Sequence, residues 1–161
     1  MIQRVQTLFL FLATVAIILL AFFPIANFTN AATADSNTAY LIFYVFEISN
    51  EAGPDPFSFW FILPLIVVSA GVAIISLITV FLYKNRPLQI KLSQTSIFLN
   101  VILIVSLLFF YIDRIESETQ TMANYEYIGI YLPLISLVFL VLALRFIKKD
   151  EKMVRSLDRL R

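Results

Sequence analysis

Residues 57–83 read FSFWFILPLIVVSAGVAIISLITVFLY, a stretch without a single charged side chain. A helix rises about 1.5 Å per residue, so about 20 residues cover the roughly 30 Å hydrocarbon core of a bilayer. Backbone N–H and C=O groups in lipid must be paired within the chain, which favours a helix over an extended segment. Residues 57–83 are therefore predicted to form a transmembrane helix.

Three further stretches have the same character, at about residues 8–28, 95–112 and 127–147, and the one charge within them is Arg145. Of the 161 residues 60% are hydrophobic and 14% are charged, against about a quarter charged in ordinary soluble domains. The sequence predicts an all-α membrane protein, a four-transmembrane up-down-up-down helix bundle spanning residues 1–147. A cleaved signal peptide is the alternative for the first stretch, but its apolar run is longer than the 7–15 residues typical of one.

The basic residues predict the orientation of this bundle. With four spans, the N-terminus, the loop at 84–93 and the C-terminal segment share one side, and all but Arg114 of the 12 Lys and Arg residues lie there. The positive-inside rule makes that side cytoplasmic. We therefore expect a multi-pass protein with both termini in the cytoplasm.

The chain has no cysteine and no histidine. Disulfides, thiolate nucleophiles, zinc sites of the usual kind and imidazole acid–base catalysis are therefore excluded. Acidic residues gather in the second outer loop, at Asp113, Glu116, Glu118 and Glu126, but no base and nucleophile accompany them. The protein is predicted not to be an enzyme and to have no catalytic residues, cofactor or metal. Metal binding at the four carboxylates is a minor alternative.

The letters LPLI occur twice, around Pro64 and Pro133, inside two of the predicted spans. Two other pairs of similar segments align in the same order: residues 2–7 with 90–95, and residues 22–25 with 109–112. The matches indicate two repeated hairpins related by an axis along the membrane normal. Chance matching of Phe, Leu and Ile in so apolar a chain is the competing explanation, and both stay open.

Each of these prolines removes a backbone donor and frees the carbonyl four residues earlier, at Trp60 and Gly129. Two kinked helices would splay the outer half of the bundle. In one interpretation neighbouring helices compensate for the lost bonds; in the other the freed carbonyls line an outward vestibule. Compensation by neighbouring helices is favoured, because no charged residue within the membrane lies near the prolines to give a vestibule a function.

Small and polar residues mark helix–helix contacts in a membrane, where lipid is as apolar as leucine. The candidates are Ala13, Ala21, Ser69, Ala73, Ser76, Ser93, Ser96, Asn100, Gly129, Ser136 and Ala143. Asn100 is the amide well inside a span, and it is predicted to bridge helices rather than to bind a ligand. Asn100, Pro64 and Pro133 are thus candidate structural residues within the membrane.

The first outer loop, residues 29–56, contains a short segment at about 39–49 that is rich in β-branched and aromatic residues. It is predicted to be a strand, half of a hairpin packed on the outer helix ends. An exposed strand edge could also dock a partner. A segment lying on the lipid interface is an equal alternative.

Residues 148–161 form a basic amphipathic tail, and the last helix is expected to continue into it or to bend along the membrane. Its candidate contact residues for anionic lipid or a cytoplasmic partner are Lys148, Lys152, Arg155, Arg159, Met153, Leu157 and Leu160.

The two ends of the chain, MIQRVQTLFLFLA (1–13) and KKDEKMVRSLDRLR (148–161), resemble a family of small bacterial membrane proteins. The family is catalogued as domain of unknown function 4293 and is associated with Bacteroidota. The resemblance covers the whole chain and implies an inner-membrane protein, but it supplies no activity, ligand or catalytic residue.

The predicted function is an inner-membrane accessory or scaffold subunit that binds a larger membrane protein complex without catalysis. Nucleic acid is not expected as a partner. The alternative is a small transporter or channel-forming protein with an outward vestibule near the paired prolines. Coupled transport usually leaves an ionisable group in the middle of the membrane, and the four spans lack one.

Overall fold

The computed structural model describes residues 3–30, 41–50, 57–82 and 85–158, and these residues form a mostly helical fold with a small sheet. The helices are α1 (Gln3–Leu19), α2 (Phe59–Phe81), α3 (Arg86–Ser106), the π-helical segment η1 (Leu107–Tyr111), α4 (Ile112–Thr119), the 3₁₀ segment η2 (Ile128–Tyr131) and α5 (Leu132–Asp158). The strands are β1 (Ala26–Asn30), β2 (Leu41–Phe43), β3 (Ile48–Asn50) and β4 (Thr121–Asn124).

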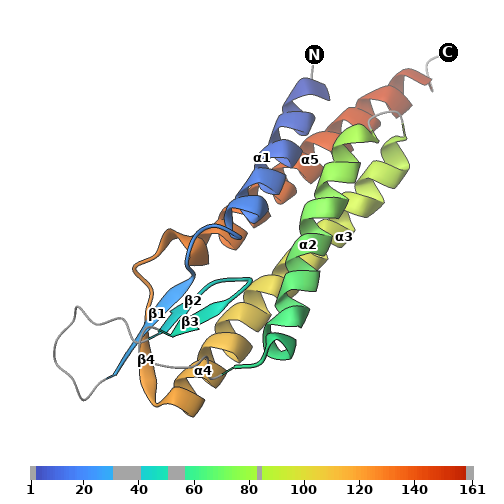
Figure 1. Ribbon diagram of the computed structural model, residues 1–161. Coiled ribbons are helices and arrows are strands. Elements are labelled where there is room, and N and C mark those ends of the chain that lie inside the picture. The colour runs from blue at the N-terminus through green and yellow to red at the C-terminus, as the bar shows by residue number, and fades with distance from the viewer. Residues whose placement is uncertain (1–2, 31–40, 51–56, 83–84, 159–161) are drawn as a thin grey trace.

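The helices pack as a four-membered bundle. Helix α1 contacts α2 and α5, and α3 contacts the same two helices. The N- and C-termini lie together at one end, which we call the terminal end, and the sheet lies at the other, the sheet end (Figure 1). Segments α3, η1 and α4 follow one another without a break from Arg86 to Thr119, 34 residues in all. At about 1.5 Å per residue this rod is about 50 Å long, longer than a bilayer core.

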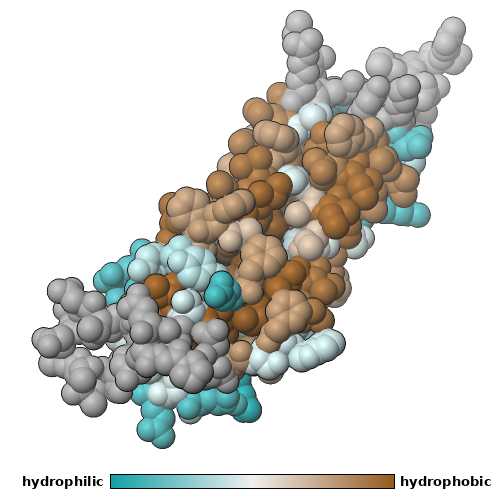
Figure 2. Space-filling model, in the orientation of Figure 1, coloured by the Kyte–Doolittle hydropathy of each residue, from teal (hydrophilic) through white to brown (hydrophobic). Residues whose placement is uncertain are grey.

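Three helical segments among the described residues are long and apolar enough to cross a membrane: Phe59–Phe81, Arg86–Thr119 and Ile128–Val154. Helix α1 is shorter, with an apolar part from Val5 to Leu19. The surface is hydrophobic over the middle of the bundle and hydrophilic toward both ends (Figure 2). Such a band indicates a membrane protein, because a soluble domain rarely exposes so large an apolar surface.

The first predicted span, 8–28, is wrong beyond Leu19. The helix ends there in a turn, and β1 begins at Ala26. Pro24 explains the stop, since it has no N–H to donate and disfavours the helical conformation in the residue before it. The next residue, Ile25, donates its N–H to the carbonyl of Phe43 at 2.7 Å and so enters the sheet instead.

The third predicted span, 95–112, is too short at both ends. The helix begins at Arg86, with Pro87 in its first turn, and continues through α4. Hydropathy detected only the apolar middle, because the first turns carry polar residues such as Gln89 and Ser93 that the bundle buries.

The sheet is antiparallel, with strand order β3-β2-β1-β4. Strands β2 and β3 form a hairpin whose turn is closed by a 2.8 Å bond from the Tyr44 N–H to the Glu47 carbonyl. The β element predicted in the first outer loop is confirmed, but the single strand predicted at 39–49 is wrong. Within the described residues, the segment forms two three-residue strands joined by a turn at 44–47, because the chain reverses there and pairs with itself. Strands β1 and β4 were not predicted. The chain turns into β4 at Gln120, whose φ of 51° is left-handed.

The sheet packs on the side of the long α3–α4 rod. Phe28 of β1 and Phe43 of β2 are fully buried together with Ile112 and Ile115. The ring of Phe43 lies 6.1 Å from that of Tyr111, centroid to centroid. The sheet therefore occupies the space beside the rod that the early end of α1 leaves empty.

The repeat suggested by the sequence is only partly reflected in the fold. Pro64 and Pro133 each follow the start of their helical segment, at Phe59 and Ile128, by five residues. The other pairs differ in structure. Gln6 is buried whereas its counterpart Gln94 is exposed, and residues 22–25 are a turn and coil whereas 109–112 are helical. The fold does not support a repeat at these positions.

Candidate functional site: a polar seam and two proline grooves

One face of α3 carries a column of buried polar side chains, which we call the polar seam: Gln89, Ser93, Ser96 and Asn100. All four are at most 2% exposed. They recur every three or four residues, so they lie on the helix face that looks into the bundle. The seam begins near the terminal end and runs about three turns toward the sheet.

Hydrogen bonds connect the seam and its surroundings across helices. The Ser76 hydroxyl of α2 lies 3.4 Å from that of Ser96, and the Gln89 amide donates to the Thr79 carbonyl at 3.3 Å. The Ser136 hydroxyl of α5 donates to the Ala13 carbonyl of α1 at 3.2 Å. All but two of the predicted small contact residues are buried, and Ala21 and Ala73 are partly buried. The prediction that small and polar residues mark helix contacts is confirmed.

Asn100 joins α3 to α5. Its Nδ2 donates to the Pro133 carbonyl at 3.2 Å, while its Oδ1 has no protein partner among the described residues. Beyond Asn100 toward the sheet, the same face of the rod continues with Leu103, Leu107 and Tyr111, all at most 3% exposed. The polar seam therefore ends at Asn100, and an apolar core follows it.

Both proline turns receive a hydrogen bond from the long α3–η1 helix. Near Pro64, the Tyr111 hydroxyl donates to the Phe61 carbonyl at 3.0 Å. At Pro133, the Asn100 amide donates to the carbonyl of Pro133 itself. The carbonyl of Gly129, which Pro133 cannot engage, accepts instead from the Leu132 N–H in the 3₁₀ segment. For Gly129 this is the compensation that membrane helices with proline usually show. The Tyr111 and Asn100 bonds instead go to the carbonyls of Phe61 and Pro133, which the prolines do not free.

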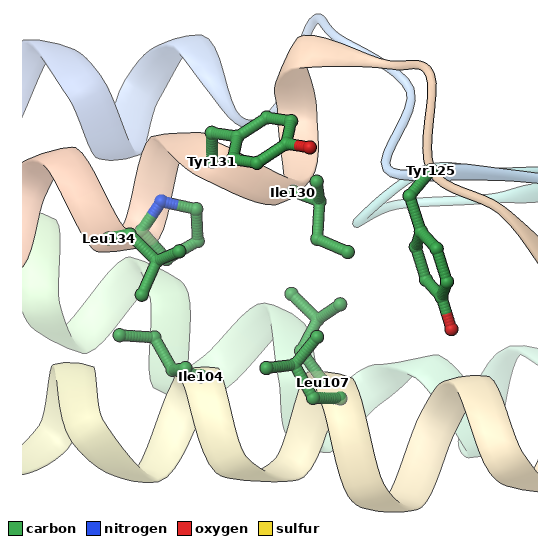
Figure 3. A pocket seen from close by; sticks show the side chains of 8 residues that line it. Ile104, Leu107, Tyr125, Ile130, Tyr131 and Leu134 are labelled. Carbon is green, nitrogen blue, oxygen red and sulfur yellow. The ribbon is translucent and has the colours of Figure 1, made fainter.

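Each proline also borders an apolar groove. The first, which we call the Pro133 groove, has a volume of about 290 Å³ and is lined by Ile104, Leu107, Leu108, Tyr125, Ile130, Tyr131, Pro133 and Leu134. One wall comes from α3 and η1 and the other from η2 and α5, and Tyr125 comes from the loop between β4 and η2 (Figure 3). The second, the Pro64 groove, has a volume of about 470 Å³ and is lined by Trp60, Phe61, Pro64, Leu65, Val68, Ile102, Ser106, Phe110 and Tyr111.

The π-helical segment η1 contributes residues to both grooves, Leu107 and Leu108 to the first and Phe110 and Tyr111 to the second. Such π segments are frequent at functional sites in proteins. Leu65, which lines the second groove, is buried in the same hydrophobic core as Leu103 and Leu132. The two proline-containing helices thus border lateral grooves beside a packed core.

A family described as Domain of unknown function (DUF4293) matches residues 2–160. The chain belongs to this family. No curated protein and no solved structure matches the DUF4293 chain significantly.

The acidic loop of this DUF4293 protein has structural partners for two of its carboxylates. Glu116 Oε1 accepts from the backbone N–H of Ala123 at 2.7 Å, on strand β4 at one edge of the sheet. Glu118 pairs with Arg114 at 2.6 Å. Within the described part of the chain, no group of three acidic residues is arranged to hold a metal ion.

The tail is helical as far as the structure describes it, because α5 continues to Asp158 without a break. Lys148, Lys152 and Met153 are exposed. The side chains of Arg155 and Leu157, and the whole of Arg159 and Leu160, lie outside the described residues.

The start of the tail is fastened to the rest of the terminal end. Arg86 at the start of α3 contacts the Asp150 carboxylate at 3.2 Å and its carbonyl at 3.3 Å. Phe146 stacks on Phe9 with ring centroids 5.6 Å apart, and Ile147 is 1% exposed. The last apolar turn of α5 before the tail therefore packs inside the bundle, and Asp150 fastens the first turn of the tail to α3.

Proposed function

We propose that this DUF4293 protein is an accessory or scaffold subunit of the bacterial inner membrane that binds a larger membrane protein complex and performs no catalysis. The observation that supports this best is a stripe of exposed side chains on α2. Trp60, Val67, Ile74 and Phe81 recur every seventh residue and are 76%, 61%, 56% and 71% exposed. We call it the α2 stripe.

The spacing of the α2 stripe suits a helical partner. A straight α-helix drifts by about 20° per seven residues, so a strict seven-residue repeat stays in line only when two helices coil around each other. Exposed Ala70 lies between Val67 and Ile74. A small residue there lets a second backbone approach closely, which is how helices associate in lipid.

The proposed topology is up-down-up-down with both termini in the cytoplasm. Its support is that the N- and C-termini share one end of the bundle (Figure 1) and that the basic residues gather there. Anionic lipid would then meet Lys148, Lys152, Arg155 and Arg159, each basic residue contributing about 1 kcal/mol near a charged surface.

A transporter or channel is the second candidate. It is favoured by two buried polar atoms, Ser93 Oγ and Asn100 Oδ1, that have no hydrogen-bond partner within the described part of the chain. It ranks lower because the polar seam ends against Leu103 and Leu107. Solute flux into vesicles containing the purified protein would reverse this order.

The test of the scaffold proposal uses Ala70→Trp, which adds bulk at the centre of the α2 stripe. Val138→Trp on α5 is the control, since Val138 is 57% exposed and lies off the stripe. After purification from native membranes in mild detergent, we expect the wild type and the control to retain a stoichiometric membrane partner. Ala70→Trp should lower its yield at least about tenfold, equivalent to about 1.4 kcal/mol. A wild type purified alone, or equal partner yields for both variants, would contradict the proposal.

A further inference from the structure

The Pro133 groove combines apolar walls with one tyrosine at its sheet end and a second tyrosine on the wall formed by η2 and α5. Ile104, Leu107 and Leu134 form apolar walls, and Tyr125 lies at the end nearer the sheet (Figure 3). The Tyr131 hydroxyl points toward the same end. Tyrosine is enriched where lipid tails meet headgroups, because its ring is apolar and its hydroxyl is polar. The groove thus has the profile of a site that receives an acyl chain and its ester or phosphate oxygens.

Negative charge borders the tyrosine end. Burial raises the pKa of the Tyr125 phenol, and the nearby Glu116 carboxylate raises this pKa further. Tyr125 therefore keeps its proton and remains a hydrogen-bond donor. Glu126 follows it directly in the chain, whereas Arg114, the basic residue of this loop, is paired with Glu118. A cationic group would be attracted to this rim and an anionic headgroup repelled.

We propose that the Pro133 groove binds an outer-leaflet phospholipid that carries a primary ammonium, as phosphatidylethanolamine does. One acyl chain lies between Ile104 and Leu134, the tyrosine hydroxyls donate to phosphate or ester oxygens, and the ammonium lies beside Glu116. This inference rests on the membrane placement proposed above. Neither groove has a charged residue in its lining. The selectivity expected for the Pro133 groove comes from the Glu116 carboxylate near Tyr125 at its rim.

The experiment measures contact between one tryptophan and brominated lipid, because bromine on an acyl chain quenches tryptophan fluorescence at close range. Trp60, the one tryptophan in the chain, is first changed to Phe. The reporter is then Tyr131→Trp at the groove or, as control, Val138→Trp two turns along α5. Each protein is placed in phosphatidylcholine vesicles that contain dibrominated phosphatidylethanolamine or dibrominated phosphatidylglycerol at equal fraction.

At position 131 we expect the quenching to show an apparent association constant for phosphatidylethanolamine about threefold higher than that for phosphatidylglycerol. At position 138 the two lipids should quench equally. Glu116→Gln keeps an acceptor for the Ala123 N–H but removes the charge, so it should bring the ratio at 131 close to one. Leu134→Phe, which fills the groove, should do the same.

Equal quenching by both lipids at position 131, or a preference for phosphatidylglycerol, would overturn the inference while leaving the membrane placement intact. A preference for phosphatidylethanolamine that is the same at position 138 would also overturn it, since the selectivity would then not belong to the groove. Absence of quenching at both positions would instead refute the membrane placement, and the inference with it.

Discussion

Replacing Gly129 by alanine is expected to lower the free energy of unfolding by about 3 kcal/mol or more, the upper part of the range for forced overpacking. A Cβ at this position would lie 2.2 Å from the Pro24 carbonyl oxygen and 2.7 Å from its carbon. Both atoms are backbone, so no side chain can turn away to make room. The contact holds the segment between α1 and β1 against η2. Loss of this contact should separate the segment at Pro24, and the sheet that follows it, from the start of α5.

Gly71→Ala is the matched control for this prediction. The nearest atom to a Cβ there is Leu99 Cδ1, at an ordinary contact distance of 3.9 Å. Alanine stabilises a helix interior by about 0.5–1 kcal/mol relative to glycine, so this variant should equal or exceed the wild type. Unfolding in mixed detergent micelles, followed by circular dichroism, compares the two. Similar effects of both substitutions would show that the close approach at Pro24 does not exist.

Asn100→Asp is expected to destabilise the bundle by about 3 kcal/mol, the magnitude found for a charge placed near the centre of a membrane helix. The side chain is fully buried, and the neighbouring acceptor is the Pro133 carbonyl, which would repel a carboxylate. The nearest residues of the rod toward the sheet are apolar, so no cation compensates. Yield in the membrane fraction and thermal stability in detergent are the measurements.

Asn100→Leu distinguishes a structural role from a ligand-binding one. It removes one helix–helix hydrogen bond, about 1 kcal/mol in a membrane. It also removes the Oδ1, which has no partner among the residues that the structure describes. Stability should therefore stay within about 1 kcal/mol of the wild type, and partner binding through the α2 stripe should persist. Loss of partner binding in a folded Asn100→Leu protein would contradict the structural role.

Much of the helical architecture could be predicted from the sequence, because long uncharged runs have one stable backbone conformation in lipid. The misjudged boundary at Leu19 shows the limit of this rule. Residues 20–28 are apolar enough for a helix, yet Pro24 and the pairing of β1 with two strands decide otherwise. One of those strands, β4, lies about a hundred residues away in the chain. Hydropathy within a window carries no information about such a partner.

Some residues of the candidate site could be predicted from the sequence, but most of their contacts could not. Asn100 and the two prolines could be identified because an amide or a proline is unusual in a membrane helix. The hydrogen bond from Tyr111 to Phe61 could not, since the π-helical segment that positions Tyr111 leaves no pattern in the sequence. Gly129 could be recognised as a small contact residue, but not as the point where η2 meets Pro24. That contact depends on the early end of α1.

Single-cysteine labelling tests the central claim most directly, because the chain has no cysteine of its own. Ser117→Cys lies in α4 at the sheet end and Lys152→Cys in α5 at the terminal end, both at exposed positions. The account predicts that a membrane-impermeant maleimide labels position 117 in intact spheroplasts and labels position 152 only after lysis, with both proteins retained in membranes after an alkaline wash. Labelling of position 152 from outside, or release of the protein by the wash, would contradict it.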